Sequence, residues 1–132
     1  AIAYSETKAF AEASLAHLYT ALEWSSGADP ALLARALASS PVVTAWDGDT
    51  LVGLASTLSD DTWWVHYSHL LVHPDYQHQG IGSAIVDRLK AKYGGLHQHI
   101  LVAAAGGAMG FYQTQGFEPG SGTAMWQVGF EL

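Results

Sequence analysis

A glycine-bearing turn between an apolar segment and an amphipathic stretch constrains the fold of this chain more than any other feature. The apolar segment ends at Val72, and the turn, residues 77–83, contains Gly80 and Gly82. Apolar residues then recur at helical spacing and predict a helix to about Lys92: Ile81, Ile85, Val86 and Leu89. This order predicts strand, turn and helix, and the crossover rule places the next strand, residues 99–103, parallel to the first.

The start of the predicted helix is suited to binding an anion. The first backbone N–H groups of a helix lack intrahelical partners and carry a partial positive charge, and glycine allows a ligand to approach closely. The turn lacks the third glycine of a dinucleotide-binding turn and the Lys-Ser/Thr of a P-loop. Two glycines before a helix are weak evidence by themselves, because such a turn can serve only to pack a helix on a strand.

Composition excludes several classes of function. With 49% hydrophobic and 13% charged residues, we expect residues 1–132 to form a single folded domain. The net charge of -7 argues against nucleic-acid binding and against an anionic membrane, while it suits a cationic substrate. The absence of cysteine excludes disulfides and a cysteine nucleophile and fits a reducing cytoplasm. No apolar run is long enough to span a bilayer, and the N-terminus lacks a secretory signal pattern. A cytoplasmic protein is therefore expected.

The rest of the chain predicts helices around a mixed, mostly antiparallel sheet. The expected elements, in chain order, are a strand at 3–4, helices at 6–20 and 30–38, strands at 42–46, 51–58 and 63–72, a short helix containing Met109, Phe111 and Tyr112 that opens at Gly106-Gly107, and a last strand at 126–130. Three of these strands form an antiparallel meander. Helices and a mixed sheet in one domain indicate an α/β or α+β fold.

Two segments resemble signatures of the GCN5-related N-acetyltransferase (GNAT) family. The first is an apolar strand ending in Val72-His73-Pro74, a short polar turn, and then Gln77-x-x-Gly80-x-Gly82, which resembles the acetyl-CoA signature. The second, Phe111-Tyr112-x-x-x-Gly116-Phe117, resembles the family's Phe-Tyr-x-x-x-Gly-Phe segment. The resemblance covers most of the chain. It implies the acyl-CoA N-acyltransferase fold and an N-acetyltransferase that moves the acetyl group of acetyl-CoA to a primary amine by direct attack on the thioester.

The resemblance also implies roles for individual residues. Backbone groups at the strand end would lie along the pantetheine arm of acetyl-CoA: Leu70, Leu71 and Val72. Backbone amides of the turn would hold the pyrophosphate: Gln77, His78, Gln79, Gly80, Ile81, Gly82 and Ser83. Tyr112 would lie near the cofactor sulfur and protonate the leaving thiolate. An alternative is that Tyr112 only packs beside Phe111.

No family motif identifies the base that takes a proton from the amine. A lysine-like amine has a pKa of about 10, and histidine is the side chain whose unperturbed pKa lies near neutrality. His69 immediately precedes the strand end that would bind the cofactor, and His66 lies one pleat further away. Strand alternation places them on opposite faces unless a bulge intervenes, so one at most should face the amine, and we favour His69. Three alternatives stay open: the base acts through a water molecule, the reaction uses no protein base, or the histidine is only hydrogen-bonded.

The sequence departs from the family pattern at two points. Ala105 stands where the family often has a polar residue that contacts the cofactor, and the turn lacks the Arg or Lys often found there. A non-catalytic module of the same fold that binds acyl-CoA or another phosphate ligand is therefore the alternative. The seven histidines form no set with a carboxylate at ligand spacing, so no metal is expected. The acceptor, a small-molecule or peptide amine, stays open, and an apolar last strand would allow a homodimer.

Overall fold

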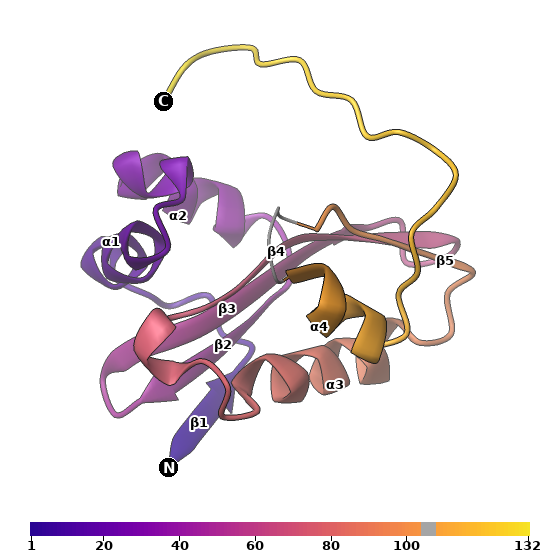
Figure 1. Cartoon of the computed structure of the whole chain (residues 1–132). Helices are drawn as coiled ribbons and strands as arrows, with labels where there is room; N and C mark the ends of the chain where they lie inside the picture. The colour runs from indigo at the N-terminus through magenta and orange to yellow at the C-terminus, as the bar shows by residue number, and fades with distance from the viewer. Residues whose placement is uncertain (104–107) are drawn as a thin grey trace.

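The computed structural model describes residues 1–103 and 108–132 of the chain. Two helices, α1 (Glu12–Ala21) and α2 (Pro30–Ala38), cover one face of a central sheet, as Figure 1 shows. Two others, α3 (Ile81–Tyr93) and α4 (Ala108–Thr114), lie on the opposite face. Single-turn 3-10 helices at Ser25–Ala28 and Pro74–Tyr76 connect α1 to α2 and the sheet to α3.

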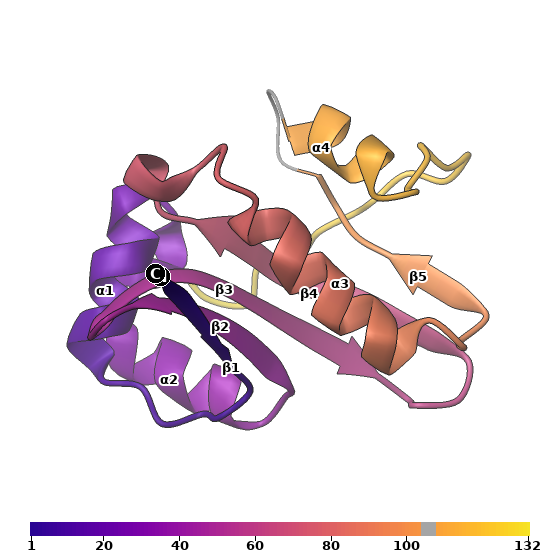
Figure 2. The ribbon, with the colours of Figure 1, turned by 90° about the horizontal axis from the view of Figure 1, so that it is seen from below.

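The sheet has five strands in the order β1-β2-β3-β4-β5. The strands are β1 (Ile2–Ser5), β2 (Val42–Asp47), β3 (Thr50–Ser59), β4 (Trp64–Val72) and β5 (Gln98–Ile100). The first four pair antiparallel, and β5 pairs parallel with β4 after the crossover through α3 (Figure 2). The predicted fold class, a mixed and mostly antiparallel sheet flanked by helices, is confirmed.

Two hydrophobic layers hold the helices on the sheet. Leu15, Leu18 and Tyr19 of α1 pack with α2 on one face, and α3 packs on the other. At Gly53 of β3, an added Cβ would lie only 3.2 Å from the Cδ1 atom of Ile85, so glycine is what lets α3 approach the sheet there. This close packing holds the first turn of α3 against the sheet.

The N-terminal elements differ from the predicted ones in one place. The first helix begins at Glu12 and not near residue 6, because β1 continues to Ser5 and the chain then turns. The Ser5 hydroxyl accepts a hydrogen bond from the Thr7 backbone N–H at 3.1 Å and so stabilises this turn. The second helix is confirmed, and the Asp29 carboxylate caps it by accepting from the Leu32 N–H at 3.1 Å.

The C-terminal elements differ more. The strand expected at 99–103 is only Gln98–Ile100, and the strand expected at 126–130 is wrong, because residues 118–132 are exposed and form no strand. A β-strand needs a neighbouring edge for its backbone hydrogen bonds, and no strand of residues 1–103 and 108–132 pairs with that segment. The short helix with Met109, Phe111 and Tyr112 is confirmed as α4. Its expected opening at Gly106-Gly107, and Ala105, lie outside the described residues.

Candidate active site

A bulge in β4 decides which side chains face which helices. The register shifts so that Ser56 pairs with His69 while Thr57 pairs with Tyr67, which leaves Ser68 as the extra residue. The Ser68 hydroxyl donates to the Ser56 carbonyl at 3.1 Å and fixes the irregularity. One extra residue reverses the alternation along the strand.

The bulge therefore places the two candidate histidines on the same face. Tyr67 before it and Leu70 after it both belong to the layer beneath α3. His69 contacts Tyr19 of α1, on the opposite face, and His66 shares that face by alternation with Tyr67. Regular alternation, which would place His66 and His69 on opposite faces, does not hold in this strand. The bulge, which we named as the exception, places both histidines on one face.

The parallel strands β4 and β5 pair over a short length only. Their register covers three pairs, from Trp64 with Gln98 to His66 with Ile100. Beyond His66, β4 continues to Val72, while the chain that leaves β5 rises away from it toward α4 (Figure 2). The second half of β4 therefore has a long edge without a β5 partner, which an extended ligand can approach.

A cavity of about 560 Å³ lies between this half of β4, the glycine turn and α4. Ten of the residues predicted from the motifs line it: Leu70, Leu71, Val72, Gln77, His78, Gly80, Ile81, Gly82, Ser83 and Tyr112. The remaining predicted residue of the turn, Gln79, is exposed outside the lining, and its side-chain amide donates to the Asp75 carbonyl at 3.4 Å. The fold thus brings the two motifs, about 30 residues apart in sequence, to one cavity.

The turn contains two residues in the left-handed backbone region. His78 and Gly80 adopt left-handed φ values of 63° and 84°, and α3 begins directly after Gly80. No side chain in the described part of the chain caps this helix start, and its first three residues, Ile81 to Ser83, line the cavity. None of the described residues that line it is a lysine or arginine. Uncapped amides are therefore the main positive electrostatic feature that the described lining offers to an anion.

Glycine at position 82 serves the packing of α4. An added Cβ there would lie 3.2 Å from the Cζ atom of Phe111 and 3.9 Å from the Cγ2 atom of Val72. Phe111 therefore rests on the first turn of α3, and the next residue, Tyr112, faces the cavity. Burial raises the pKa of Tyr112 above its ordinary value, so its phenol keeps its proton at neutral pH and can donate it.

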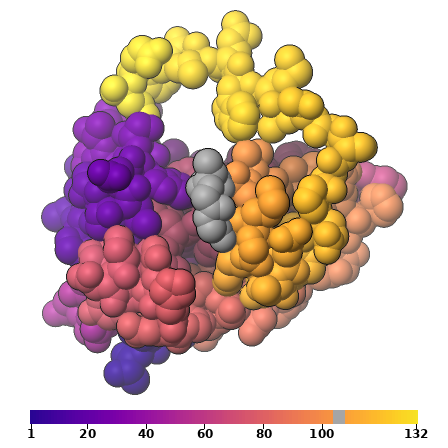
Figure 3. Space-filling model, in the orientation of Figure 1, coloured from indigo at the N-terminus to yellow at the C-terminus, as the bar shows by residue number. Residues whose placement is uncertain are grey.

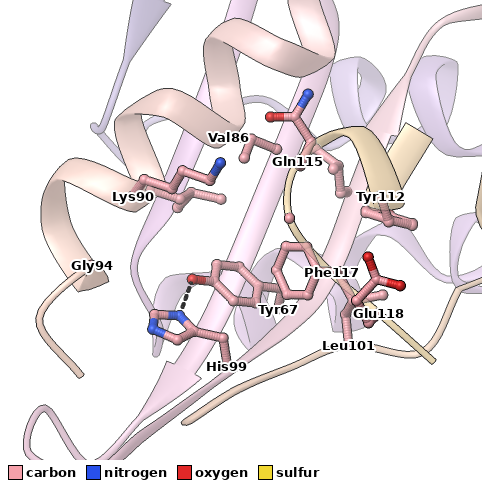
Figure 4. A pocket seen from close by; sticks show the side chains of 13 residues that line it. Tyr67, Val86, Lys90, Gly94, His99, Leu101, Tyr112, Gln115, Phe117 and Glu118 are labelled. Carbon is pink, nitrogen blue, oxygen red and sulfur yellow. Dashed lines mark hydrogen bonds between the residues drawn. The ribbon is translucent and has the colours of Figure 1, made fainter. Parts of the chain in front are cut away.

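A second cavity of about 480 Å³ continues from the first, with Leu70 and Tyr112 in both linings. Figure 4 shows Lys90 of α3 on one side of this cavity and Glu118 on the other. The hydroxyl of Tyr67 lies 2.8 Å from Nδ1 of His99. Tyr112, Gly116 and Phe117 of this lining belong to the second motif. Sequence reasoning gave no role to Lys90, His99 and Glu118, since no local motif joins them.

His99 in this cavity has a defined proton arrangement. Its Nε2 atom lies 3.1 Å from the Leu96 carbonyl, which can only accept a hydrogen bond. The neutral ring therefore carries its hydrogen on Nε2, and Nδ1 accepts from the Tyr67 hydroxyl. Both ring nitrogens are thus used in structural hydrogen bonds.

His69 lies in an aromatic cluster on the α1 side of the sheet. Its Nδ1 atom is 2.6 Å from the Tyr19 hydroxyl, and the Trp24 ring meets it edge-on at a centroid distance of 5.4 Å. Burial, and secondarily the proximity of His66, lower the pKa of His69 below 6.5. Burial raises the pKa of Tyr19. At neutral pH, therefore, His69 is uncharged and can accept a proton.

Tyr19 was missed in the sequence analysis. It lies in the apolar spacing of α1 beside Leu15 and Leu18, and like them it is fully buried. Its position therefore predicts only a core aromatic. The signal that distinguishes it is the hydroxyl, because a buried phenol requires a hydrogen-bonding partner, and here the partner comes from β4.

Two further observations concern metals and membranes. Among residues 1–103 and 108–132, no three His, Asp or Glu side chains are grouped so that they could hold a metal ion. In the same described part of the chain, no helix has the length and apolar character needed to span a membrane.

Solved structures share this fold over nearly the whole chain. A GNAT-family acetyltransferase of Streptococcus pneumoniae is 29% identical and superposes with a TM-score of 0.83, covering 99% of this chain and 100% of that one. Glucosamine-6-phosphate N-acetyltransferase of Arabidopsis thaliana is 11% identical, with a TM-score of 0.74 and coverage of 98% and 99%. An aminoglycoside acetyltransferase from an uncultured soil sample is 16% identical, with a TM-score of 0.74 and coverage of 97% and 99%.

The last two likenesses show the fold alone, because their identities are low. No curated protein matches the chain significantly. The model of the acetyltransferase (GNAT) domain matches residues 6–125, which include both motifs, the bulged strand and α3. This chain therefore belongs to the GNAT family of acetyltransferases.

Proposed function

We propose that this protein transfers the acetyl group of acetyl-CoA to a primary amine by direct attack of the amine on the thioester. The observation that carries the proposal is the 560 Å³ cavity in which the end of β4, the uncapped start of α3 and Tyr112 meet. An elongated ligand with a diphosphate at one end and a reactive group at the other suits such a cavity.

The donor half of the site would bind through the backbone. The amides from Gln77 to Ser83 would hold the diphosphate, and the free edge of Leu70 to Val72 would hydrogen-bond the pantetheine amides as an added strand does. The side-chain amide of Gln77 already donates to the Val72 carbonyl at 2.9 Å, so its contribution to the ligand would be its backbone N–H.

The chemistry needs one proton acceptor and one proton donor. The amine nitrogen forms a bond to the acetyl carbon, the carbon–sulfur bond breaks, and the sulfur leaves as thiolate. His69, uncharged at neutral pH, would take the proton of the amine, directly or through water. Tyr112, whose phenol stays protonated, would give its proton to the thiolate. We place His66, on the same face as His69, as the second candidate base.

The acceptor is proposed to be a primary amine on a small molecule or a peptide. Two proteins of this fold are named for glucosamine 6-phosphate and for aminoglycosides, and both of these substrates carry primary amines. The net charge of -7 favours the approach of a cationic amine. On the α1 side, the rings of Tyr19 and Trp24 beside His69 would form part of the acceptor's surroundings.

The test is the release of free thiol from acetyl-CoA in the presence of a panel of amines. We expect turnover with the wild type and a loss of about 10²-fold or more in kcat for Tyr112→Phe, while calorimetry gives a similar CoA affinity for both. Equal kcat values would exclude Tyr112 as the acid. CoA binding without turnover on any amine would favour the non-catalytic module, and no heat of CoA binding would exclude acetyl-CoA as the co-substrate.

A further inference from the structure

The second cavity, of about 480 Å³, has a size that the transfer of an acetyl group does not explain. It shares Leu70 and Tyr112 with the first cavity and continues from them between α3 and α4. In the space-filling view of Figure 3, the atoms of α4, in orange, lie against those of α3, in salmon. Small-molecule sites in proteins occupy about 300–1,000 Å³. The space beyond Tyr112 is therefore much larger than the methyl group of an acetyl needs.

Most of the surface that this cavity presents is apolar. Val86 and Leu89, buried on α3, form one wall, and Leu101, just after β5, lies in the lining as well. The rings of Tyr67 and Phe117 meet edge-on at a centroid distance of 5.5 Å and add an aromatic surface. These side chains come from two strands, two helices and the segments after them, so the fold itself shapes the cavity.

Three polar side chains of this lining already have hydrogen-bonding partners. The Tyr67 hydroxyl lies 2.8 Å from Nδ1 of His99, whose Nε2 lies 3.1 Å from the Leu96 carbonyl. The side-chain amide of Gln115 donates to the Ser83 hydroxyl at 3.2 Å. A polar ligand would have to compete with these bonds, whereas an apolar ligand would leave them intact. The lining therefore suits a hydrocarbon.

We propose that the second cavity binds the hydrocarbon chain of an acyl-CoA longer than acetyl-CoA, and that the protein transfers such acyl groups as well as acetyl. This inference rests on the proposed function, which places the thioester sulfur beside Tyr112. Because Leu70 and Tyr112 line both cavities, an acyl chain that extends beyond the thioester carbon enters the second cavity directly.

The chemistry of the transfer is the same for a longer chain. The amine nitrogen forms a bond to the acyl carbon, the carbon–sulfur bond breaks, the amine gives its proton to the base, and the thiolate takes one from Tyr112. The hydrocarbon chain forms and breaks no bond, so the second cavity contributes through binding alone.

The charged residues of the lining limit the length of chain that gains from the cavity. Lys90 and Glu118 are both exposed, and Figure 4 shows them on opposite sides of the cavity. A chain that extends past them reaches water and buries no further surface. Each methylene group that is buried tightens binding about fourfold. Affinity should therefore rise with chain length and then level off, while free CoA, which ends at the sulfur, does not reach this cavity.

The first experiment compares free CoA with acetyl-, butanoyl-, hexanoyl- and octanoyl-CoA on the full chain. Calorimetry gives the Kd of each, and we expect it to fall about fourfold per added methylene group until it levels off. Thiol release with an amine that accepts acetyl measures transfer, and mass spectrometry of the product identifies the acyl group. We expect butanoyl and hexanoyl transfer with a lower KM for the donor than acetyl transfer has.

The second experiment fills the cavity from two different walls. Leu101→Trp does so from the segment after β5, and Val86→Phe does so from α3. We expect the ratio of the acetyl-CoA Kd to the hexanoyl-CoA Kd to fall toward one in both variants. Val102→Trp, the matched control, adds similar bulk at the neighbouring position, which is 49% exposed and lies in neither lining, and it should keep the wild-type ratio.

The outcomes separate this inference from the proposed function. Acetyl transfer together with Kd values that do not fall with chain length would overturn the inference and leave the proposed function in place. The same holds if the fall persists in both Leu101→Trp and Val86→Phe, because the chain would then lie elsewhere. Tight binding of hexanoyl-CoA without transfer of its acyl group would also overturn the inference. No heat with free CoA or with any acyl-CoA would overturn both.

Discussion

The hydroxyl of Tyr19 lies 2.6 Å from Nδ1 of His69, and this contact joins helix α1 to the bulged strand at the point where β4 and β5 have separated. When Nδ1 carries the ring hydrogen and donates it to Tyr19, Nε2 is the free acceptor that a general base requires. The Tyr19 hydroxyl therefore influences which ring nitrogen of His69 carries the hydrogen.

Tyr19→Phe removes this partner and keeps the ring. Because a buried polar atom is left unsatisfied, we expect the free energy of unfolding to fall by about 1–3 kcal/mol, measured by urea denaturation. We also expect kcat to fall by more than KM changes, since Nδ1 of His69 loses its hydrogen-bonding partner. Tyr4→Phe, in β1 and outside both cavity linings, is the control and should change little. An unchanged kcat in Tyr19→Phe would show that the Tyr19 hydroxyl takes no part in proton transfer.

The lowered pKa of His69 predicts a pH dependence of stability. The folded protein binds this proton less readily than the unfolded chain, whose histidine titrates near 6.5. The contribution of neutral His69 is therefore complete above pH 6.5 and declines as the pH falls from there toward the lower folded pKa. Unfolding measured between pH 5 and 8 should show a smaller loss at the acid end for His69→Gln than for the wild type. His97→Gln, at an exposed site, should follow the wild type.

The same titration predicts an acid limb in the activity. If His69 takes the proton of the amine, kcat/KM should decline below a pH that is lower than 6.5, because the protonated ring cannot act as a base. We expect His69→Gln to lack this limb and to have a lower kcat/KM at neutral pH. If the limb persists in His69→Gln and disappears in His66→Gln, the base is His66.

Gly82→Ala tests the packing of α4 on α3. The new methyl group would lie 3.2 Å from the Cζ atom of Phe111, so the aromatic ring and α4 must shift. We expect the Kd for CoA to rise several-fold in calorimetry, because Tyr112 on α4 moves with Phe111. Gly95→Ala, whose methyl group would meet nothing within 4 Å, is the control. Equal Kd values for the two variants would contradict this role of Gly82.

Tyr67→Phe tests whether the second cavity is structural. The change leaves Nδ1 of His99 without its donor, so the free energy of unfolding should fall by about 1–3 kcal/mol in urea denaturation. CoA affinity should stay within about twofold of the wild type, since Tyr67 does not line the first cavity. A large loss of CoA binding with unchanged stability would instead place the second cavity in the cofactor site.

The part of the fold that sequence predicts best is the part with local signals. Runs of β-forming residues bounded by turn signals identify β2, β3 and β4, and helical spacing identifies α3, which buries one face. The cofactor residues are contiguous in sequence, so a motif finds them together. The strand expected at 126–130 is wrong despite its β-forming residues, since a strand also requires an edge, and which edge is available depends on the arrangement of the whole sheet.

The proton-transfer side of the site is predicted less well for a physical reason. Whether His66 and His69 share a face depends on Ser68, a residue whose local sequence carries no signal of a bulge. The partner of His69 comes from position 19, fifty residues earlier, and is brought there by the packing of α1. Long-range contacts of this kind have no periodicity to detect.

The single unpaired residue in β4 also limits how this strand can change. Removing Ser68 would turn Trp64 to Tyr67 over, so that Tyr67 would leave the layer under α3 and His66 would enter it. Insertions or deletions in this half of the strand are therefore tolerable only in pairs. The extra residue at position 68 is as much a requirement of the molecule as the identity of the histidines beside it.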